Sequence, residues 1–261
     1  MRNTSETGRM NLETVLDVTH YNDNLFWFKT TKSDAWKEKN FQPGEFTMIG
    51  MGDDKLTRAY SIANSPQDDY LEFLSIKVEN GPLTSRLKNI KVNDKIEVTV
   101  KPIGTLLLRN LDPEPCINDK GRLWLISTGT GLAPFLSIAR HYEAYDYYKE
   151  IIVTHTCRTN DELVFRPELE KFGAKVWQSV TRESPAGLAH KGRVTEAIAD
   201  GSLFSDLELK QDWFDIRYDR IMICGNIDFN NEIRDMLEAK GWEHGTMRSP
   251  GHFVQEKAFV G

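Results

Sequence analysis

The sequence predicts a two-domain protein in which an antiparallel β-barrel is followed by an α/β domain with a doubly wound parallel sheet. Three observations support this fold class. The N-terminal part carries short apolar or alternating stretches separated by turn residues, which is typical of a small barrel or sandwich. The rest alternates apolar strands with helical patterns, which is typical of a parallel sheet. A length of 261 residues also suits two cores better than one.

The barrel is expected to contain several short strands and one helical turn. The strands are predicted at residues 25–29, 46–49, 60–63, 71–78 and 95–100. Turns between them are supplied by Pro43-Gly44, Asp53-Asp54, Ser65-Pro66 and Asn93-Asp94. The helical turn is expected to start at Gly81-Pro82-Leu83-Thr84.

A proline pair marks the predicted domain boundary. Pro113 and Pro115 disfavour helix and strand ladder alike, so the domains are predicted to be residues 1–113 and 114–261. Residues 1–9 are polar and are expected to be a disordered lead-in.

The second domain is expected to repeat a strand followed by a helix. Strands are predicted at residues 123–127, 151–155, 175–180 and 220–223, with helices running through 138–139 and near 167–172, 195–199 and 229–239. In the last helix Phe229, Ile233 and Leu237 share a face, and Gly241 lies where a glycine commonly ends a helix. This alternation predicts helices on both faces of the sheet.

A glycine-rich turn connects the first of these strands to its helix. The run Leu123-Trp124-Leu125-Ile126 leads into Ser127-Thr128-Gly129-Thr130-Gly131, and Pro134 is acceptable in a first helical turn. Gly129 and Gly131 allow the backbone to approach a pyrophosphate, and a helix N-terminus offers amides and partial positive charge. The functional interpretation is a nucleotide site, and the structural alternative is a plain tight turn.

Composition excludes several other classes. A formal net charge of -6, with no block of Lys or Arg, argues against a nucleic-acid binder. The three cysteines are too scattered for a disulfide framework or a zinc site, and no histidine pair has metal-ligand spacing, so no metal is expected. No apolar run approaches the ~18 residues that span a bilayer, and no secretory signal is evident. We expect a cytoplasmic protein without a membrane segment.

Five motifs in a fixed order give a more specific indication. They are Phe41-Gln42-Pro43-Gly44, Arg58-Ala59-Tyr60-Ser61, Gly81-Pro82-Leu83-Thr84-Ser85, residues 127–135 and Cys224-Gly225-Asn226, followed by the ending Glu256-Lys257-Ala258-Phe259-Val260. Any one of them could arise by chance, but the whole series resembles the bacterial branch of the ferredoxin–NADP reductase family. The resemblance runs from about Leu12 to the C-terminus.

The resemblance implies an FAD site on the barrel. An aromatic ring can stack on an isoalloxazine or ribityl chain, and a guanidinium can neutralise a pyrophosphate. The residues implied for FAD are Arg58, Ala59, Tyr60, Ser61, Gly81, Leu83, Thr84, Ser85, Ala258 and Phe259. The structural alternative for Arg58 and Tyr60 is a barrel strand with a core tyrosine and a surface arginine, and for Thr84 and Ser85 a routine helix cap.

The resemblance also implies an NADP site on the second domain. Selectivity for NADPH requires a cation near the 2′-phosphate, and ligands of such sheets bind after strand C-termini. The residues implied for NADP are Thr128, Gly129, Thr130, Gly131, Arg158, Thr181, Arg182, Arg193, Gly225 and Asn226. The alternative for each arginine is a solvated surface residue.

Three residues are implied for catalysis: Ser61 near flavin N5, Cys224 beside the nicotinamide and Glu256 in proton movement or in holding the nicotinamide pocket. The alternative for Cys224 is a buried small apolar residue. The implied activity carries hydride from NADPH to FAD, and single electrons from FAD to a small acidic partner, ferredoxin or flavodoxin. A monomer is expected. Two alternatives remain: an NADH-using flavin reductase that serves an oxygenase or cytochrome, and a regulatory subunit that holds FAD without turnover.

Overall fold

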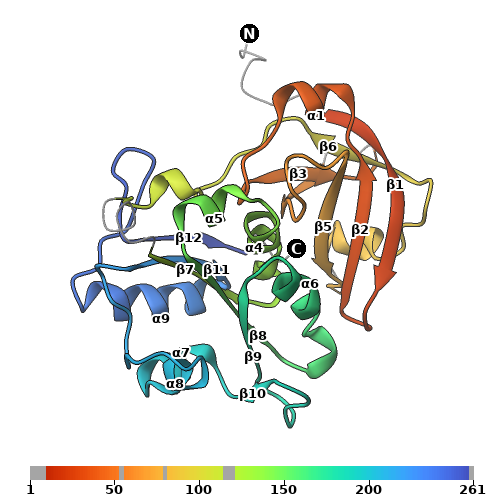
Figure 1. The fold of residues 1–261 in the computed structure, drawn as a ribbon. Coiled ribbons are helices and arrows are strands. Elements are labelled where there is room, and N and C mark those ends of the chain that lie inside the picture. Colours follow the sequence, from red (N-terminus) through yellow and green to blue (C-terminus); the bar gives the residue numbers. More distant parts are fainter. Residues whose placement is uncertain (1–9, 53–55, 79–80, 114–120, 259–261) are drawn as a thin grey trace.

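The computed structural model describes residues 10–52, 56–78, 81–113 and 121–258. Within these residues the chain forms two six-stranded sheets, with strand orders β4-β3-β6-β1-β2-β5 and β10-β9-β8-β7-β11-β12. Every pairing in the first sheet is antiparallel and every pairing in the second is parallel. The predicted fold class is confirmed, and the two units lie side by side (Figure 1).

The five strands predicted for the barrel are all present, with shifted ends. They are β2 (Leu25–Thr31), β3 (Phe46–Gly50), β4 (Thr57–Ser61), β5 (Tyr70–Ile76) and β6 (Lys95–Thr99). The predicted helical turn is α2 (Thr84–Leu87), which starts slightly later than Gly81. A short helix, α1 (Asp34–Lys39), and a 3-10 turn, η1 (Leu108–Asn110), complete the unit.

The longest barrel strand, β1 (Met10–His20), was not predicted from the sequence. Its apolar residues do not keep one alternation: Val15 is buried, whereas Leu12 and Leu16 are exposed. Glu13, on the same face as Val15, is buried, so residue type does not follow burial in this strand, and a register shift against β2 between Val15 and Asp17 adds a further irregularity.

The α/β domain has the predicted order of strands and helices. Its strands are β7 (Arg122–Thr128), β8 (Glu150–Cys157), β9 (Lys175–Val180), β10 (His190–Lys191), β11 (Asp219–Gly225) and β12 (Phe253–Lys257). Its helices are α4 (Ala133–Ala139), α5 (Glu143–Tyr147), α6 (Arg166–Lys171), α7 (Val194–Ala199), α8 (Ser202–Asp206) and α9 (Ile227–Glu238), with 3-10 turns η2 (Gly129–Leu132) and η3 (Asn160–Glu162).

The two faces of the parallel sheet are buried against different partners. Trp124, Ile126 and Ile223 pack with residues of α7, α8 and α9. Leu123 and Leu125 pack with α4 and α6 and also with the outer surface of the barrel, where Trp27 and Leu74 join the same cluster. The barrel has its own interior core. One face of the sheet is therefore shared between the two units (Figure 1).

The predicted boundary between residues 113 and 114 stays a prediction, because residues 114–120 lie outside the described part of the chain. The last residues before it already contact the second unit: Asp112 N donates to Gly251 O at 2.7 Å, and Arg220 Nε donates to Asp112 O at 2.7 Å. The expected disorder of residues 1–9 likewise falls outside the described residues.

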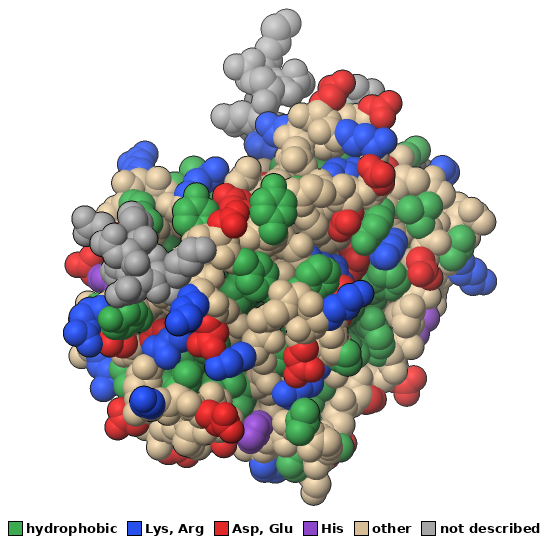
Figure 2. Space-filling view, viewed as in Figure 1, with side chains coloured by type: hydrophobic (Ala, Val, Ile, Leu, Met, Phe, Trp, Pro, Cys, Tyr) green, Lys and Arg blue, Asp and Glu red, His purple; other side chains and the backbone are tan. Residues whose placement is uncertain are grey.

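Charge is mixed on the surface drawn in Figure 2, where acidic and basic side chains are interspersed. Among the described residues, no helix is long and apolar enough to cross a membrane. The same residues contain no group of His, Cys, Asp or Glu that could hold a metal ion.

Candidate functional site

The candidate site lies where the parallel strands end, on both sides of the point at which the strand order reverses. β7 is the first strand of the sheet in sequence, with β8 on one side of it and β11 on the other. Ligands of doubly wound sheets bind beyond the carboxyl ends of the strands at such a reversal. The glycine-rich turn and the segment after Cys224 both occupy this edge.

The two glycines of the turn have different structural reasons. Gly129 has φ +53°, a conformation that disfavours a side chain, although the space around it is open. Gly131 has no such backbone constraint, but an ideal Cβ placed there would lie 2.1 Å from the carbonyl oxygen of Cys224. Gly131 thus allows the loop to pack against the end of β11, and Gly129 leaves an open surface for a ligand.

A buried histidine forms a hydrogen bond with the backbone of this turn. His155 on β8 is 1 % exposed, and its Nε2 lies 2.9 Å from the carbonyl oxygen of Gly129. Burial lowers the pKa of His155 to about 4, so the ring is neutral at pH 7. Because a carbonyl oxygen only accepts hydrogen bonds, Nε2 carries the proton and donates a hydrogen bond to the carbonyl oxygen of Gly129. The sequence analysis did not assign His155 a role; its signal is a histidine near the carboxyl end of a buried strand, within Thr154-His155-Thr156.

Cys224 and Glu256 are neighbours across two parallel strands. They pair in register between β11 and β12. Cys224 is buried, and its burial raises the pKa of the thiol well above its usual value, with the charge of Glu256 adding to the effect. The thiol is therefore protonated at neutral pH and acts as a small apolar side chain.

Glu256 has one satisfied and one unsatisfied oxygen. Its Oε2 accepts hydrogen bonds from the backbone N of Thr105 at 2.7 Å and from the Thr105 hydroxyl at 3.1 Å. Its Oε1 is buried and has no hydrogen-bond partner among the residues that the structure describes. Burial raises the pKa of Glu256 to about 7, and the carboxyl of Glu45 raises it further while the Thr105 bonds oppose the shift. A carboxyl that titrates near neutrality can hold or release a proton during a reaction.

Gly225 and Asn226 form the turn that starts α9. An ideal Cβ on Gly225 would lie 2.5 Å from the hydroxyl oxygen of Thr128, so the ends of β11 and β7 meet there without room for a side chain. The side chain of Asn226 accepts a hydrogen bond from Phe229 N at 3.0 Å and caps the helix. The backbone N of Ala258 donates to Gly225 O at 2.8 Å, which brings the chain's end to this turn. Phe259 lies outside the described residues.

The three predicted arginines are exposed at the same edge of the sheet. Arg158 follows β8, and Arg182 follows β9, with Arg182 N donating to Arg158 O at 2.9 Å. Thr181 precedes Arg182, and its hydroxyl donates to Cys157 O at 3.2 Å. Arg193 precedes α7. Among the described residues, none of the three guanidinium groups makes an ion pair, although the carboxylates of Glu162 and Glu196 accept hydrogen bonds from the backbone N of Arg158 and of Arg193 at this edge.

On the barrel, the predicted Arg58 and Tyr60 have different environments. Tyr60 is 7 % exposed and belongs to the barrel core, edge-to-face with Phe28 and Phe73. The hydroxyl of Ser75 on β5 donates to the Tyr60 hydroxyl at 3.4 Å, across the two strands that end the sheet order. This placement corresponds to the core-tyrosine alternative. A stacking role on a flavin stays a prediction.

Arg58, Ala59 and Ser61 complete the same strand. Arg58 is partly exposed and donates from Nη1 to its neighbour Thr57 O at 2.9 Å. Among the described residues its guanidinium has no carboxylate partner. Ala59 is buried, and Ser61 is partly exposed at the end of β4, paired with Phe46.

The segment before α2 is tightly folded. An ideal Cβ on Gly81 would lie 2.1 Å from the Thr84 hydroxyl oxygen, and Ser85 N donates to Gly81 O at 3.0 Å. Thr84 and Leu83 are buried, whereas Ser85 is partly exposed. The helix α2 is only four residues long and offers few free amides. The prediction that this segment holds a diphosphate therefore depends on Ser85 and on the turn before the helix.

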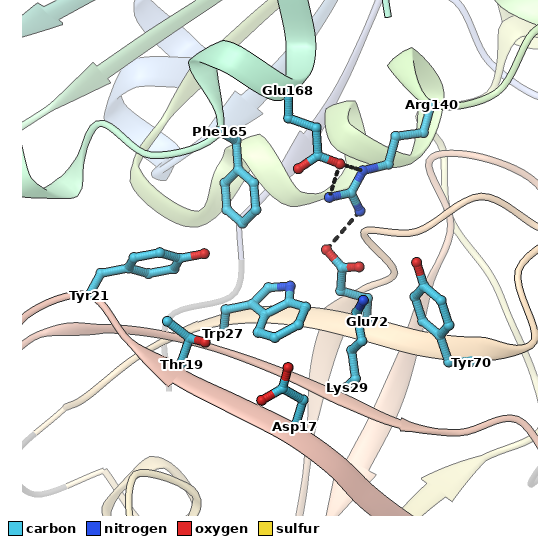
Figure 3. Close-up of a pocket in the computed structure, with 10 residues that line it drawn as sticks. All are labelled: Asp17, Thr19, Tyr21, Trp27, Lys29, Tyr70, Glu72, Arg140, Phe165 and Glu168. Atoms are coloured by element: carbon cyan, nitrogen blue, oxygen red, sulfur yellow. Dashed lines mark hydrogen bonds and ion pairs between the residues drawn. The ribbon is translucent and has the colours of Figure 1, made fainter. Parts of the chain in front are cut away.

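A hollow that the sequence analysis did not predict lies between the barrel and the elements α4 and α6 (Figure 3). Aromatic and charged side chains from both units line it. They are Asp17, Thr19, Tyr21, Trp27, Lys29, Tyr70, Glu72, Arg140, Phe165 and Glu168. Lys29 Nζ lies 4.1 Å from the ring centre of Tyr70, so the chain's own cation covers that aromatic face.

Comparisons with known proteins agree with one another. Residues 125–235 match the family model described as oxidoreductase NAD-binding domain. A flavodoxin/ferredoxin–NADP reductase of Rhodobacter capsulatus is 41% identical over 95% of this chain and 93% of its own length. A ferredoxin–NADP reductase of Azotobacter vinelandii is 39% identical over 97% of this chain and 99% of its own length. A solved structure of a ferredoxin NADP+ reductase from Neisseria gonorrhoeae, with bound FAD and NADP, superposes with a TM-score of 0.84 at 25% identity, covering 96% of this chain and 99% of that one.

Proposed function

The chain belongs to the ferredoxin–NADP reductase family, and from this premise we propose that it carries hydride between NADPH and FAD and single electrons between FAD and ferredoxin. It is an FAD-dependent oxidoreductase. The observation that carries the proposal is the cluster of Gly131, Cys224 and Glu256. These residues bring the phosphate loop, the end of β11 and a barrel loop through Thr105 into one contact.

The residues present fit both nucleotide cofactors. For NADP, the open surface at Gly129 and the three unpaired guanidiniums suit a pyrophosphate and a 2′-phosphate. For FAD, the Arg58 guanidinium, which has no carboxylate partner among the described residues, and the hydroxyl of Ser85 suit a diphosphate. The buried Oε1 of Glu256, which has no partner among the same residues, can accept a further hydrogen bond. Bound FAD would supply the step from two-electron to one-electron transfer, which no side chain can perform.

We assign the reacting region to three residues of this chain. Glu256, with its pKa near 7, holds a proton beside the site and can exchange it. Cys224 remains neutral, and its small side chain at the end of β11 would not obstruct a planar ring bound beside it. Ser61 is partly exposed at the end of β4, so its hydroxyl is available to a bound ligand.

NADPH rather than NADH is the proposed donor because of Arg158, Arg182 and Arg193. An unpaired guanidinium binds phosphate in a bidentate manner, and NADH has no 2′-phosphate to bind. Three such groups at one edge of the sheet therefore favour the phosphorylated nucleotide.

The finer assignments concern the partner and the setting. We propose that flavodoxin can replace ferredoxin as the electron carrier, that the protein works as a monomer, and that it works in the cytoplasm. Support for the carriers comes from relatives named flavodoxin/ferredoxin–NADP reductase.

A carrier-dependent assay tests this function. NADPH oxidation is followed in the presence of FAD-loaded protein, with and without ferredoxin or flavodoxin, and NADH replaces NADPH in a parallel series. We expect rapid oxidation of NADPH only when a carrier is present. A preference for NADH would support a reductase that serves an oxygenase or cytochrome. No turnover with either nucleotide would support a regulatory subunit and would contradict the proposal.

A further inference from the structure

One arginine joins the two units through buried contacts (Figure 3). Arg140 directly follows α4, and its side chain is 8 % exposed. Its Nη1 donates to Glu72 Oε1 of β5 at 2.7 Å and to Ala63 O at 2.8 Å, and its Nε donates to Glu168 Oε1 of α6 at 2.8 Å. Glu72 and Ala63 belong to the barrel, whereas Glu168 belongs to the same unit as Arg140.

The two ends of this link are close in sequence to the two halves of the candidate site. α4 continues directly from the glycine-rich turn, and its seven residues span about 10 Å. On the other side, Ala63 comes two residues after Ser61, the end of β4. Arg140 thus connects the helix of the phosphate loop to the continuation of the strand proposed to hold flavin.

A second hydrogen bond reinforces the same contact between the units. We call this contact the seam: Ala63 and Asn64 of the barrel against α4 and Arg140. The fully buried hydroxyl of Ser137 on α4 donates to Asn64 O at 2.7 Å. The side chain of Asn64 is in turn fixed, because its Oδ1 accepts from Glu72 N at 2.9 Å and its Nδ2 donates to Tyr70 O at 2.8 Å. The carbonyls of Ala63 and Asn64 both accept bonds from α4 and its end, so the segment has one position relative to that helix.

The charge network makes this position specific. Interfaces between domains of one chain generally permit relative motion. A buried guanidinium tolerates little displacement, because each lost partner leaves a charge without compensation in a desolvated place. Burial disfavours the charged form of Arg140, but Glu72 and Glu168 outweigh it and raise its pKa, so the group is charged at every accessible pH.

We propose that Arg140 is a positioning residue, which through Glu72 and Ala63 fixes the separation between the phosphate-loop helix and the strand β4. This inference rests on the proposed function, because the separation matters when nicotinamide and flavin must meet across the two units. Reacting atoms need a narrow range of distance, and a misplacement of about 1 Å can reduce a rate by about a hundredfold.

The test uses three single variants of the full-length, FAD-loaded protein. Glu72→Gln weakens the contact of Arg140 with the barrel. Glu168→Gln makes the same chemical change at the other partner of the same guanidinium, within one unit, and serves as the matched control. Ser137→Ala removes the hydrogen bond to Asn64 without altering a charge. If Glu72→Gln does not fold, the rate and exchange of Ser137→Ala alone test the proposal.

Two readouts are measured. The first is the single-turnover rate of flavin reduction at saturating NADPH, with the dissociation constant of NADP+ from a separate titration. The second is hydrogen exchange, on the protein without nucleotide, in peptides that cover residues 63–72 and 133–141. For Glu72→Gln and Ser137→Ala we expect an approximately tenfold and a smaller loss of rate respectively, little change in the dissociation constant, and faster exchange at the seam. Glu168→Gln should change rate and exchange much less than Glu72→Gln, because the Glu168 side chain is 38 % exposed, against 2 % for Glu72, and does not belong to the barrel.

Equal effects of Glu72→Gln and Glu168→Gln, or an unchanged rate in both seam variants, would overturn the inference. A wild-type protein whose flavin NADPH does not reduce would instead overturn the proposed function. The hydrogen-exchange difference between the two glutamate variants would still report on the seam in that case.

Discussion

At the scale of single residues, environment rather than residue type decides the chemistry of this site. Glu232 is exposed on α9, whereas Glu256 has a buried oxygen without a partner among the described residues, and burial raises the pKa of Glu256 to about 7. Sequence patterns named Glu256 and Cys224 through resemblance alone. Their pairing across β11 and β12, and the support of Gly129 by His155, depend on strand register and could not be read from spacing.

Glu256 predicts a pH dependence of stability. Its pKa is about 7 in the folded chain and near the ordinary 4.5 when unfolded, so between these values the folded state binds more protons. The contribution of Glu256 to the free energy of unfolding should therefore fall as pH rises from about 5 to about 8. His155, whose pKa is lowered to about 4, contributes the opposite slope below about pH 6.5, and it does so equally in wild type and in a Glu256 variant. Thermal unfolding of wild type and of Glu256→Gln is measured across this range. The free energy of unfolding of wild type, relative to that of the variant, should fall as pH rises.

The exposed Glu232→Gln on α9 is the control and should follow wild type. If Glu256→Gln keeps the wild-type slope, then Glu256 does not hold the extra proton.

Arg182 predicts a difference between nucleotides. A charge-assisted hydrogen bond contributes about 1.5–3 kcal/mol, so Arg182→Ala should raise KM for NADPH about ten- to a hundredfold and leave KM for NADH nearly unchanged. Arg217→Ala is a suitable control, because Arg217 is exposed, pairs with Asp215 and precedes β11 at the opposite edge of the sheet. Equal losses with both nucleotides would remove Arg182 from the 2′-phosphate site.

At the scale of elements, strong apolar runs were predictable and irregular ones were not. β7, β8, β9 and β11 are buried on both faces, so continuous apolar stretches identified them. β1 lacks an apolar pattern because Leu12 and Leu16 are exposed while Glu13 is buried, and β12 lacks one because only its first two residues, Phe253 and Val254, are apolar. The pattern of a segment predicts its structure only where one face stays uniform along it.

The glycine-rich turn predicts an order of stability losses. Gly131→Ala places a methyl group 2.1 Å from a backbone carbonyl, so β11 or the loop must move, at a cost of about 1–3 kcal/mol. Gly129→Ala meets no atom within 4 Å and carries only the left-handed backbone penalty of about 1–2 kcal/mol.

Urea unfolding of both variants should give the larger loss for Gly131→Ala, with an unchanged m-value. A larger loss for Gly129→Ala would show that the loop does not pack against Cys224 as described.

At the scale of the whole molecule, the two units form one arrangement because they share a core face and a buried charge network. Trp27 and Leu74 of the barrel pack in the same cluster as Leu125 of the sheet, and Arg140 fixes the seam beside them (Figure 3). The sequence predicted both units and their order, since each has its own periodicity. It could not predict the seam, because nothing in the local pattern around Arg140, Glu72 or Ala63 marks them as neighbours.

The most direct test of the central claim is an anaerobic absorption titration of the purified, FAD-loaded protein, first with NADPH and then with NADH. The account predicts that the flavin band bleaches rapidly with NADPH and slowly with NADH, because the sheet edge with its unpaired arginines favours the phosphorylated nucleotide. A flavin that remains oxidised with both nucleotides, or a protein that retains no flavin, would contradict it.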